Sequence, residues 1–170
     1  MKQKIVISDT NIFIDLLDAG LADAFFSLPF EVHTTTYILR ELLNLEQRAA
    51  IEKHIGAGHL HITSLEGEEF VDLLLLYKRA GSNLSVNDCS VWLLASKKDG
   101  VLLTGDGNLR KKATQSGIKV HGIFYIFDKL VEHKLITLSV ASAALNFLSG
   151  HNNRLPKNEI EKRLELWKFK

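Results

Sequence analysis

The stretch Ile5-Val6-Ile7-Ser8-Asp9-Thr10-Asn11 joins a short run of β-branched apolar residues to an acid and two small polar residues. A run this short and this rich in β-branched residues indicates a buried strand rather than a helix. An ionised carboxylate at the end of a buried strand is costly to desolvate unless a partner compensates its charge. We therefore expect Asp9 to meet other polar groups, and the later acids Glu41, Asp88 and Asp106 are the candidates.

Length and composition indicate one globular domain. A chain of 170 residues buries about 70% of its unfolded surface, and 46% hydrophobic with 24% charged residues excludes a disordered chain. The single cysteine, Cys89, suits a reducing compartment. The charged terminus Met1-Lys2-Gln3-Lys4 precedes too short an apolar run for a signal peptide, and 71–77 is far shorter than the ~20 residues of a membrane span. We expect a cytoplasmic protein without a membrane span.

Strand-like and helix-like patterns alternate along the chain. After the opening run, strands are predicted at 31–35, 60–65, 101–104 and 118–120. The helices are predicted at about 12–17, 21–26, 36–54, 66–79, 85–98, 109–116, 126–134, 139–148 and 157–167. Five strands separated by helices predict an α/β fold around a parallel sheet.

Three of the four acids have a local structural explanation. Asp9 can cap the helix that follows it, and Asp106 can cap the next helix from a turn with glycine. Asp88 stands three residues after Ser85, which is the spacing of a capping box. Taken singly, each acid is explained as well by a cap as by a functional site.

Glu41 differs because it lies in the middle of a predicted helix. It follows Ile38 by three residues and precedes Leu45 by four, so the spacing places it within or beside the apolar stripe rather than on the wet face. The alternative is a glutamate at the stripe edge that reaches water.

The acids gain weight as a set, because strand ends and the starts of the following helices share one rim of a parallel sheet. Four carboxylates converging there would repel one another unless a hard cation balanced them. The chain offers no HExxH or CxxC pattern. Ligands that are all oxygen suit Mg²⁺ or Mn²⁺.

These features resemble the PIN-domain ribonucleases over roughly residues 4–136. The ordered set is more specific than any one motif. It comprises Ile7-Ser8-Asp9-Thr10-Asn11, Leu39-Arg40-Glu41-Leu42, Asn87-Asp88, Leu103-Thr104-Gly105-Asp106-Gly107-Asn108-Leu109 and Gly117-Ile118-Lys119-Val120-His121-Gly122.

The resemblance implies a three-layer α/β/α sandwich with a five-stranded, mostly parallel sheet and extra C-terminal helices. It implies a nuclease domain over 1–137, to which we expect 138–170 to add a helical extension packed on the same domain. It also implies Mg²⁺- or Mn²⁺-dependent cleavage of RNA and frequent homodimers. Many members are VapC-type toxins held inactive by a small antitoxin protein, but the tail after about Ser139 is longer than in minimal toxins.

Carried over by position, four acids match the catalytic and metal-binding set of that family: Asp9, Glu41, Asp88 and Asp106. The resemblance places Asn11 and Thr104 among the polar neighbours of that site, and we expect Thr10 and Asn108 to line it too. As a hypothesis, Asp9 and Asp106 bind metal directly while Glu41 and Asp88 complete the coordination or orient water. We further expect the RNA backbone to be contacted by the basic run Arg110, Lys111 and Lys112, although such a run alone is usually solvated surface.

Three other classes of protein are alternatives to a ribonuclease. A haloacid-dehalogenase-like phosphatase would need an acid at Asn11, and a receiver domain would need a lysine after a late strand, where Lys119 lies inside the predicted strand. The stronger rival is a catalytically inactive PIN-like module that acts through protein contacts. Intact acids at all four positions argue against it.

Overall fold

The computed structural model describes residues 4–168, so the first three residues of the charged terminus lie outside the described part. Its five strands form one sheet in which every neighbouring pair is parallel. They are β1 (Lys4–Ser8), β2 (Phe30–Thr35), β3 (Leu60–Thr63), β4 (Val101–Leu103) and β5 (Val120–His121). The predicted α/β fold with a five-stranded parallel sheet is confirmed.

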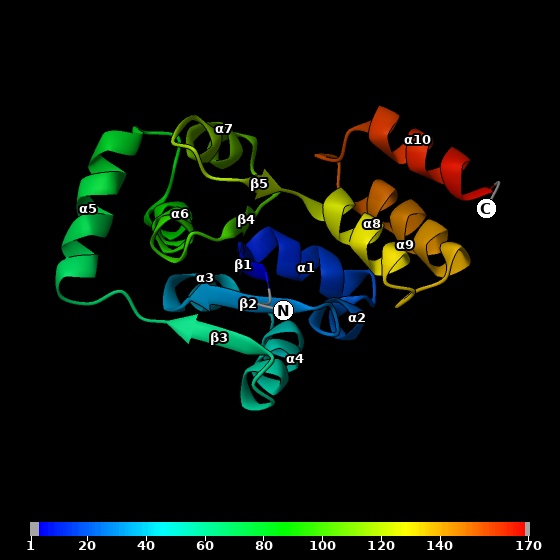
Figure 1. The fold of residues 1–170 in the computed structure, drawn as a ribbon, viewed down its shortest axis with the longest axis horizontal. Coiled ribbons are helices and arrows are strands. Elements are labelled where there is room, and N and C mark those ends of the chain that lie inside the picture. Colours follow the sequence, from blue (N-terminus) through cyan, green and yellow to red (C-terminus); the bar gives the residue numbers. More distant parts are fainter. Residues whose placement is uncertain (1–3, 169–170) are drawn as a thin grey trace.

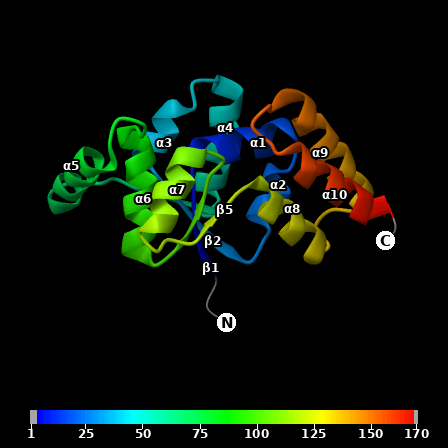
Figure 2. The same cartoon turned by 90° about the horizontal axis from the view of Figure 1, so that it is seen from above.

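Helices cover both sides of the sheet. They are α1 (Thr10–Asp18), α2 (Ala22–Phe26), α3 (Thr36–Glu41), α4 (Leu45–Gly56), α5 (Glu68–Ala80), α6 (Val86–Lys98), α7 (Gly107–Gln115), α8 (Ile123–Glu132), α9 (Leu138–His151) and α10 (Lys157–Lys168). In Figures 1 and 2, α5, α6 and α7 lie on one side of the sheet, and α1, α2, α8, α9 and α10 on the other. Among the described helices, none has both the length and the apolar character needed to cross a bilayer.

The strand order places the candidate site. It runs β3-β2-β1-β4-β5, so the chain leaves β1 towards one edge and returns to β4 on its other side. The order therefore reverses between β1 and β4, where open parallel sheets bind ligands outside the strands' carboxyl ends. Asp9 directly follows β1, and Thr104 directly follows β4.

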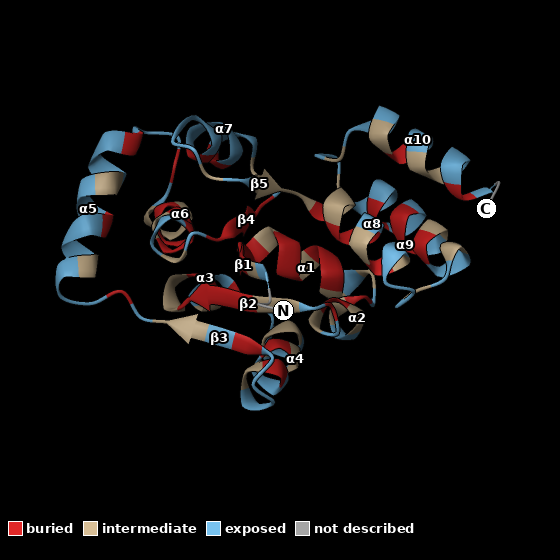
Figure 3. Ribbon diagram, viewed as in Figure 1, coloured by how far each residue is buried: buried red, intermediate tan, exposed pale blue. Residues whose placement is uncertain are grey.

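The core lies against these two central strands. Val6, Ile7, Leu102 and Leu103 have no exposed surface, and Figure 3 shows the buried residues concentrated in the sheet and on the inner faces of the helices. Burying one such side chain contributes about 1.5–3 kcal/mol. The strand ends that carry the candidate site are thus held by fully buried strands.

One predicted element is wrong. The single helix expected over 36–54 is two helices, because α3 ends at Glu41 and α4 begins at Leu45. The side chain of Asn44 accepts a hydrogen bond from the backbone N–H of Gln47 and so caps the second helix. Leu45, which the spacing assigned to a buried stripe, is 82% exposed.

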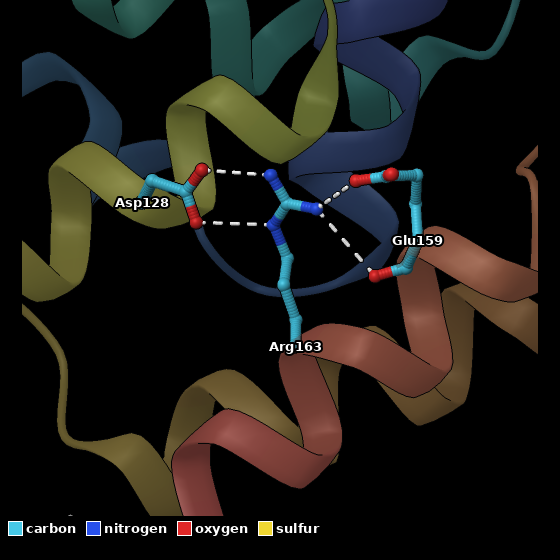
Figure 4. Close-up of polar contacts among 3 residues, drawn as sticks. All are labelled: Asp128, Glu159 and Arg163. Carbon is cyan, nitrogen blue, oxygen red and sulfur yellow. Dashed lines mark hydrogen bonds and ion pairs between the residues drawn. The ribbon is translucent and has the colours of Figure 1, made fainter.

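The tail packs on α8. Arg163 of α10 donates from Nε and Nη2 to the two carboxylate oxygens of Asp128, at 3.0 and 2.8 Å, and from Nη1 to Glu159 Oε2 at 2.6 Å (Figure 4). Trp167 lies beside Phe127, with ring centroids 6.1 Å apart. These contacts join the tail to the helix before it, while the division into 1–137 and 138–170 stays a proposal.

Candidate functional site at the carboxyl ends of β1 and β4

Asp9 is both a helix cap and the centre of a polar cluster. It is only 3% exposed, and its Oδ1 accepts the backbone N–H of Thr10 at 2.8 Å. Its Oδ2 accepts a hydrogen bond from the Thr104 hydroxyl at 2.7 Å and another from Asn11 Nδ2 at 3.2 Å. The bond to Thr104 spans the point where the strand order reverses, so Asp9 links the ends of β1 and β4.

The environment of Asp9 opposes its negative charge. Burial raises the pKa of this carboxyl to about 6, against the lowering effect of the hydrogen bonds from Thr104 and Thr10. The nearby charges of Asp88 and Glu41 raise it further. Desolvation and like charges both disfavour an ionised carboxylate, and a bound cation would offset both.

Glu41 lies at the end of α3 and is exposed, not within the apolar stripe where the spacing placed it. The reason is that α3 ends here instead of continuing. Its Oε2 accepts a hydrogen bond from the Thr10 hydroxyl, and its Oε1 accepts one from Asn87 Nδ2 at 2.5 Å. Glu41 therefore connects the starts of α1 and α6.

Asp88 forms the predicted capping box at the start of α6. Its Oδ2 accepts the backbone N–H of Ser85 at 2.8 Å, and its own N–H donates to the Ser85 hydroxyl at 3.0 Å. Burial raises the pKa of Asp88, the bonds with Ser85 lower it, and the charges of Asp106 and Glu41 raise it. The cap explains the fold of Asp88, while the charge coupling places it near the other acids.

Asp106 caps α7, as its turn position predicts. Its Oδ1 accepts the backbone N–H groups of Asn108 and Leu109, at 2.8 and 3.0 Å. Its own N–H donates to the Thr104 hydroxyl at 3.1 Å. Thr104 is fully buried, and its single hydroxyl oxygen bonds both the backbone of Asp106 and the carboxylate of Asp9.

The turn between β4 and α7 approaches α1 closely. The backbone N–H of Gly105 donates to Asn11 Oδ1 at 2.8 Å, and a Cβ at this position would lie 3.3 Å from the same oxygen. Asn11 therefore bonds both Asp9 and the turn that carries Asp106. A glycine lets the two segments approach this closely.

The four acids share one rim but do not converge into a compact cluster. Within residues 4–168, no three His, Cys, Asp or Glu side chains are grouped so as to hold a metal ion. Three of the carboxylates accept backbone hydrogen bonds at helix starts. Their ligand type still fits a hard cation, because the donors are all oxygens and their charges repel one another.

The basic run after Asp106 divides. Arg110 Nη2 donates to the carbonyl oxygen of Thr104 at 3.2 Å, so its guanidinium turns towards the site. Lys111 and Lys112 are exposed, and Lys112 borders a separate hollow lined by α5 and α6 residues. Arg110 therefore lies at the rim and Lys112 beside α5 and α6, while the contact of all three basic residues with RNA stays a prediction.

Sequence reasoning missed Asn87 as a site residue. Its side chain holds Glu41 from the start of α6. The available signal was its position beside Asp88 in the Asn-Asp motif, but the spacing could not show which acid it would bond.

Together, the fold and this rim define a parallel α/β protein with an acidic site at its topological switch point. A PIN-domain family model matches residues 5–168, and the chain therefore belongs to the PIN-domain family. The predicted family is confirmed, and the family model continues through the tail.

The individual proteins that the chain resembles share no more than 30% identity with it. The chain is 30% identical over 95 residues to endoribonuclease Nob1 of Methanocaldococcus jannaschii, a match of 56% of this chain and 47% of that protein. The chain thus spans about half the length of this relative. The structure of PAE2754 from Pyrobaculum aerophilum is similar at a TM-score of 0.55 and 15% identity, covering 76% of this chain and 96% of that one. VapBC2 of Rickettsia felis, bound to a fragment of promoter DNA, matches at a TM-score of 0.49 and 16% identity, covering 69% and 98%.

Proposed function

We propose that this protein is a divalent-metal-dependent ribonuclease that cleaves phosphodiester bonds at the rim between β1 and β4. The observation that carries the proposal is Asp9, a buried acid that bonds Thr104 across the switch point. Its pKa is raised chiefly by burial and further by the nearby charges of Asp88 and Glu41. Membership of the PIN-domain family and the endoribonuclease relative support RNA as the substrate.

Mg²⁺ or Mn²⁺ would be held by Asp9 and Asp106, with Glu41 and Asp88 completing the coordination or orienting a water molecule. When bound, such an ion supplies an activated water and stabilises charge that develops on the scissile phosphate. The acids offer oxygen ligands of the kind that Mg²⁺ binds. Asp106 accepts its capping hydrogen bonds through Oδ1 and Asp88 through Oδ2, so each has a second carboxylate oxygen to offer a cation.

The other side chains of the rim have orienting roles. Thr104 fixes the carboxylate of Asp9 and the backbone of Asp106. Thr10 and Asn87 each hold one oxygen of Glu41. Such partners of ligating groups fix their orientation and matter nearly as much as the ligands themselves. Asn108 is exposed beside Asp106 and can donate to a phosphate.

The test is cleavage of a mixed-sequence single-stranded RNA by the purified protein, with Mg²⁺, with Mn²⁺ and with a chelator. Products are separated on a denaturing gel. Cleavage that requires metal and disappears in Asp88→Ala supports the proposal. A matched control is Asp72→Ala, because Asp72 is a half-exposed acid of α5 whose ion pair with Lys97 lies away from the rim.

Absence of cleavage under all of these conditions would favour the inactive, protein-binding module.

We also propose that the ribonuclease acts in the cytoplasm, forms a homodimer and binds a small antitoxin protein. The outer helix α5 exposes Phe70, Val71, Leu74 and Leu75, which gives any protein partner an apolar surface. Light scattering of the protein alone and after co-expression with neighbouring open reading frames measures both kinds of assembly.

A further inference from the structure

A cavity of about 340 Å³ lies beside the acidic rim, between α1, the start of α7, the start of α8 and the loop that joins α9 to α10. Its lining includes Ile12, Gly105, Arg110, Gly122 and Arg154. Ligand pockets in proteins begin at about 300 Å³, so this cavity suits one nucleotide rather than a larger group. Gly105 belongs both to the cavity and to the turn between Thr104 and Asp106.

Two arginines from distant segments border the cavity. Arg110 comes from α7 and is held by the carbonyl oxygen of Thr104. Arg154 comes from the α9–α10 loop, where its N–H and Nε donate to Asn152 Oδ1 at 3.0 and 3.3 Å. Among the described residues, no carboxylate lies within ion-pair distance of Arg154. Burial raises the pKa of Asp15, and the charge of Arg154 opposes that rise across the cavity without a direct ion pair. The Arg154 guanidinium therefore keeps donors for an anion.

A buried contact fixes the loop that carries Arg154. Asn152 Nδ2 donates to both oxygens of Asp15, at 3.2 and 3.0 Å. Asp15 belongs to α1 and is only 8% exposed. Asn152 therefore bridges α1 and Arg154, so the tail loop is held against the same helix that Asp9 caps.

The start of α8 adds a third feature that favours an anion. The helix has ten residues, and its capping residue, Gly122, provides no side chain to bond the free N–H groups of the first turn. Ile123 and Phe124 of that turn line the cavity. Uncapped N–H groups and the helix dipole attract negative charge, while the aliphatic carbons of Ile12 and Ile123 suit an uncharged ring.

We propose that this cavity binds one phosphate-bearing nucleotide of the RNA strand, next to the scissile phosphate, with Arg154 of the tail contacting the phosphate. The inference rests on the proposed function, because it places the cavity on the path of the same strand. The tail is then part of the substrate site and not only a covering for α8. Two arginines face the single carboxylate of Asp15, so the cavity has a positive balance that the acidic rim lacks.

Arg163 provides an internal contrast. Its guanidinium forms ion pairs with Asp128 of α8 and Glu159 of α10, so two carboxylates already balance its charge (Figure 4). Arg154 lies nine residues earlier without such acids. Two arginines of one tail thus have different environments, and only Arg154 borders the cavity.

The test measures binding without cleavage. A 5′-fluorescein-labelled single-stranded RNA of 12 nucleotides is titrated with the protein in a chelator, and its fluorescence anisotropy is followed. Arg154→Gln is expected to weaken binding about tenfold, equivalent to about 1.4 kcal/mol. Arg48→Gln is the matched control, because Arg48 lies on α4 and pairs with Glu52; its affinity should stay within about twofold of wild type.

A second variant tests the cavity without changing the tail. Gly122→Ala would place a Cβ 2.7 Å from Arg110 Nη2, which forces the guanidinium aside. It should also weaken binding, and adenosine 5′-monophosphate should compete with the RNA better than adenosine does. Thermal melting of every variant separates loss of binding from loss of folding.

RNA affinities of Arg154→Gln and Gly122→Ala that equal the Arg48→Gln value, in folded protein, would overturn the inference. So would equal competition by adenosine and its monophosphate. Because binding is measured in a chelator, this result is independent of whether metal supports cleavage. A protein that cleaves RNA but shows no loss of affinity in Arg154→Gln retains its proposed function and loses only the nucleotide site.

Discussion

The acidic rim and the basic cavity meet at Gly105 but are built in opposite ways. In the rim, Asp9, Asp88 and Asp106 are set by the first turn of the helix each one caps. The cavity depends on Asn152 bonding Asp15, a contact across 137 positions of sequence. Local caps thus help to position three of the four groups proposed to hold metal, whereas long-range packing positions Arg154, which is proposed to hold substrate. Mutations should separate the two regions into catalysis and affinity.

The largest expected effect is in the rim. Asp9→Asn removes the charge at the switch point while Asn can still cap α1. Cleavage should fall by more than about 100-fold, beyond the range for groups that only orient a metal ligand, with RNA affinity in a chelator retained. Gel-based cleavage rates and circular dichroism measure both properties. Full activity in folded Asp9→Asn would remove Asp9 from the proposed mechanism.

Thr104→Val should have the next largest effect. The change keeps the shape of the buried side chain but removes the hydroxyl that bonds Asp9 and the backbone of Asp106. We expect metal affinity to fall about 10- to 100-fold, as measured by calorimetry with Mn²⁺. The control is Thr137→Val, which removes a hydroxyl that caps α9 instead. Equal metal affinities for the two variants would contradict the orienting role of Thr104.

Arg163→Gln sharpens the contrast within the tail. It removes the hydrogen bonds to Asp128 and Glu159, and the loss of the two-bond pair with Asp128 should lower the free energy of unfolding by about 1 kcal/mol. Urea denaturation should show this loss, while RNA affinity stays close to that of wild type. A loss of affinity as large as that of Arg154→Gln, in folded protein, would mean that the tail acts through packing alone.

The smallest expected effect is the dependence of stability on pH. The pKa of Asp9 is raised from 3.8 to about 6, so the folded protein binds its proton more tightly than the unfolded chain does. The cost of the buried charge is present above pH 6 and is relieved as pH falls. Without metal, this group should add about 1 kcal/mol to the free energy of unfolding between pH 7.5 and 5.5.

Asp9→Asn should lack that contribution, and saturating Mg²⁺ should suppress it in wild type, because a bound cation favours the charged carboxylate. The comparison uses the difference between variant and wild type, so that other titrating groups cancel. Burial lowers the pKa values of His33 and His54. Their contribution to the free energy of unfolding therefore falls as pH falls, whereas that of Asp9 rises. An identical pH dependence in both proteins would exclude a raised pKa at Asp9.

Tertiary structure changed several expectations at particular residues. Glu41 was placed near an apolar stripe because the spacing continued through Leu45, but the chain leaves the helix after Glu41 and Asn44 starts another. An apolar period cannot reveal such a break, since Leu45 fits a helix stripe equally well when it is exposed. The role of Asn87 depends in turn on the position of the Glu41 side chain, which it bonds.

By itself, the sequence determined the alternation of strands and helices, the caps at Asp88 and Asp106 and the rim on which the acids lie. These features follow from apolar periodicity, capping chemistry and the direction of parallel strands, which act over a few residues. Only the tertiary structure decided that Thr104 bonds Asp9, that Asn87 holds Glu41 and that Asn152 brings Arg154 beside the rim. Such contacts depend on how distant segments pack, because no local pattern encodes which polar side chains will be buried together.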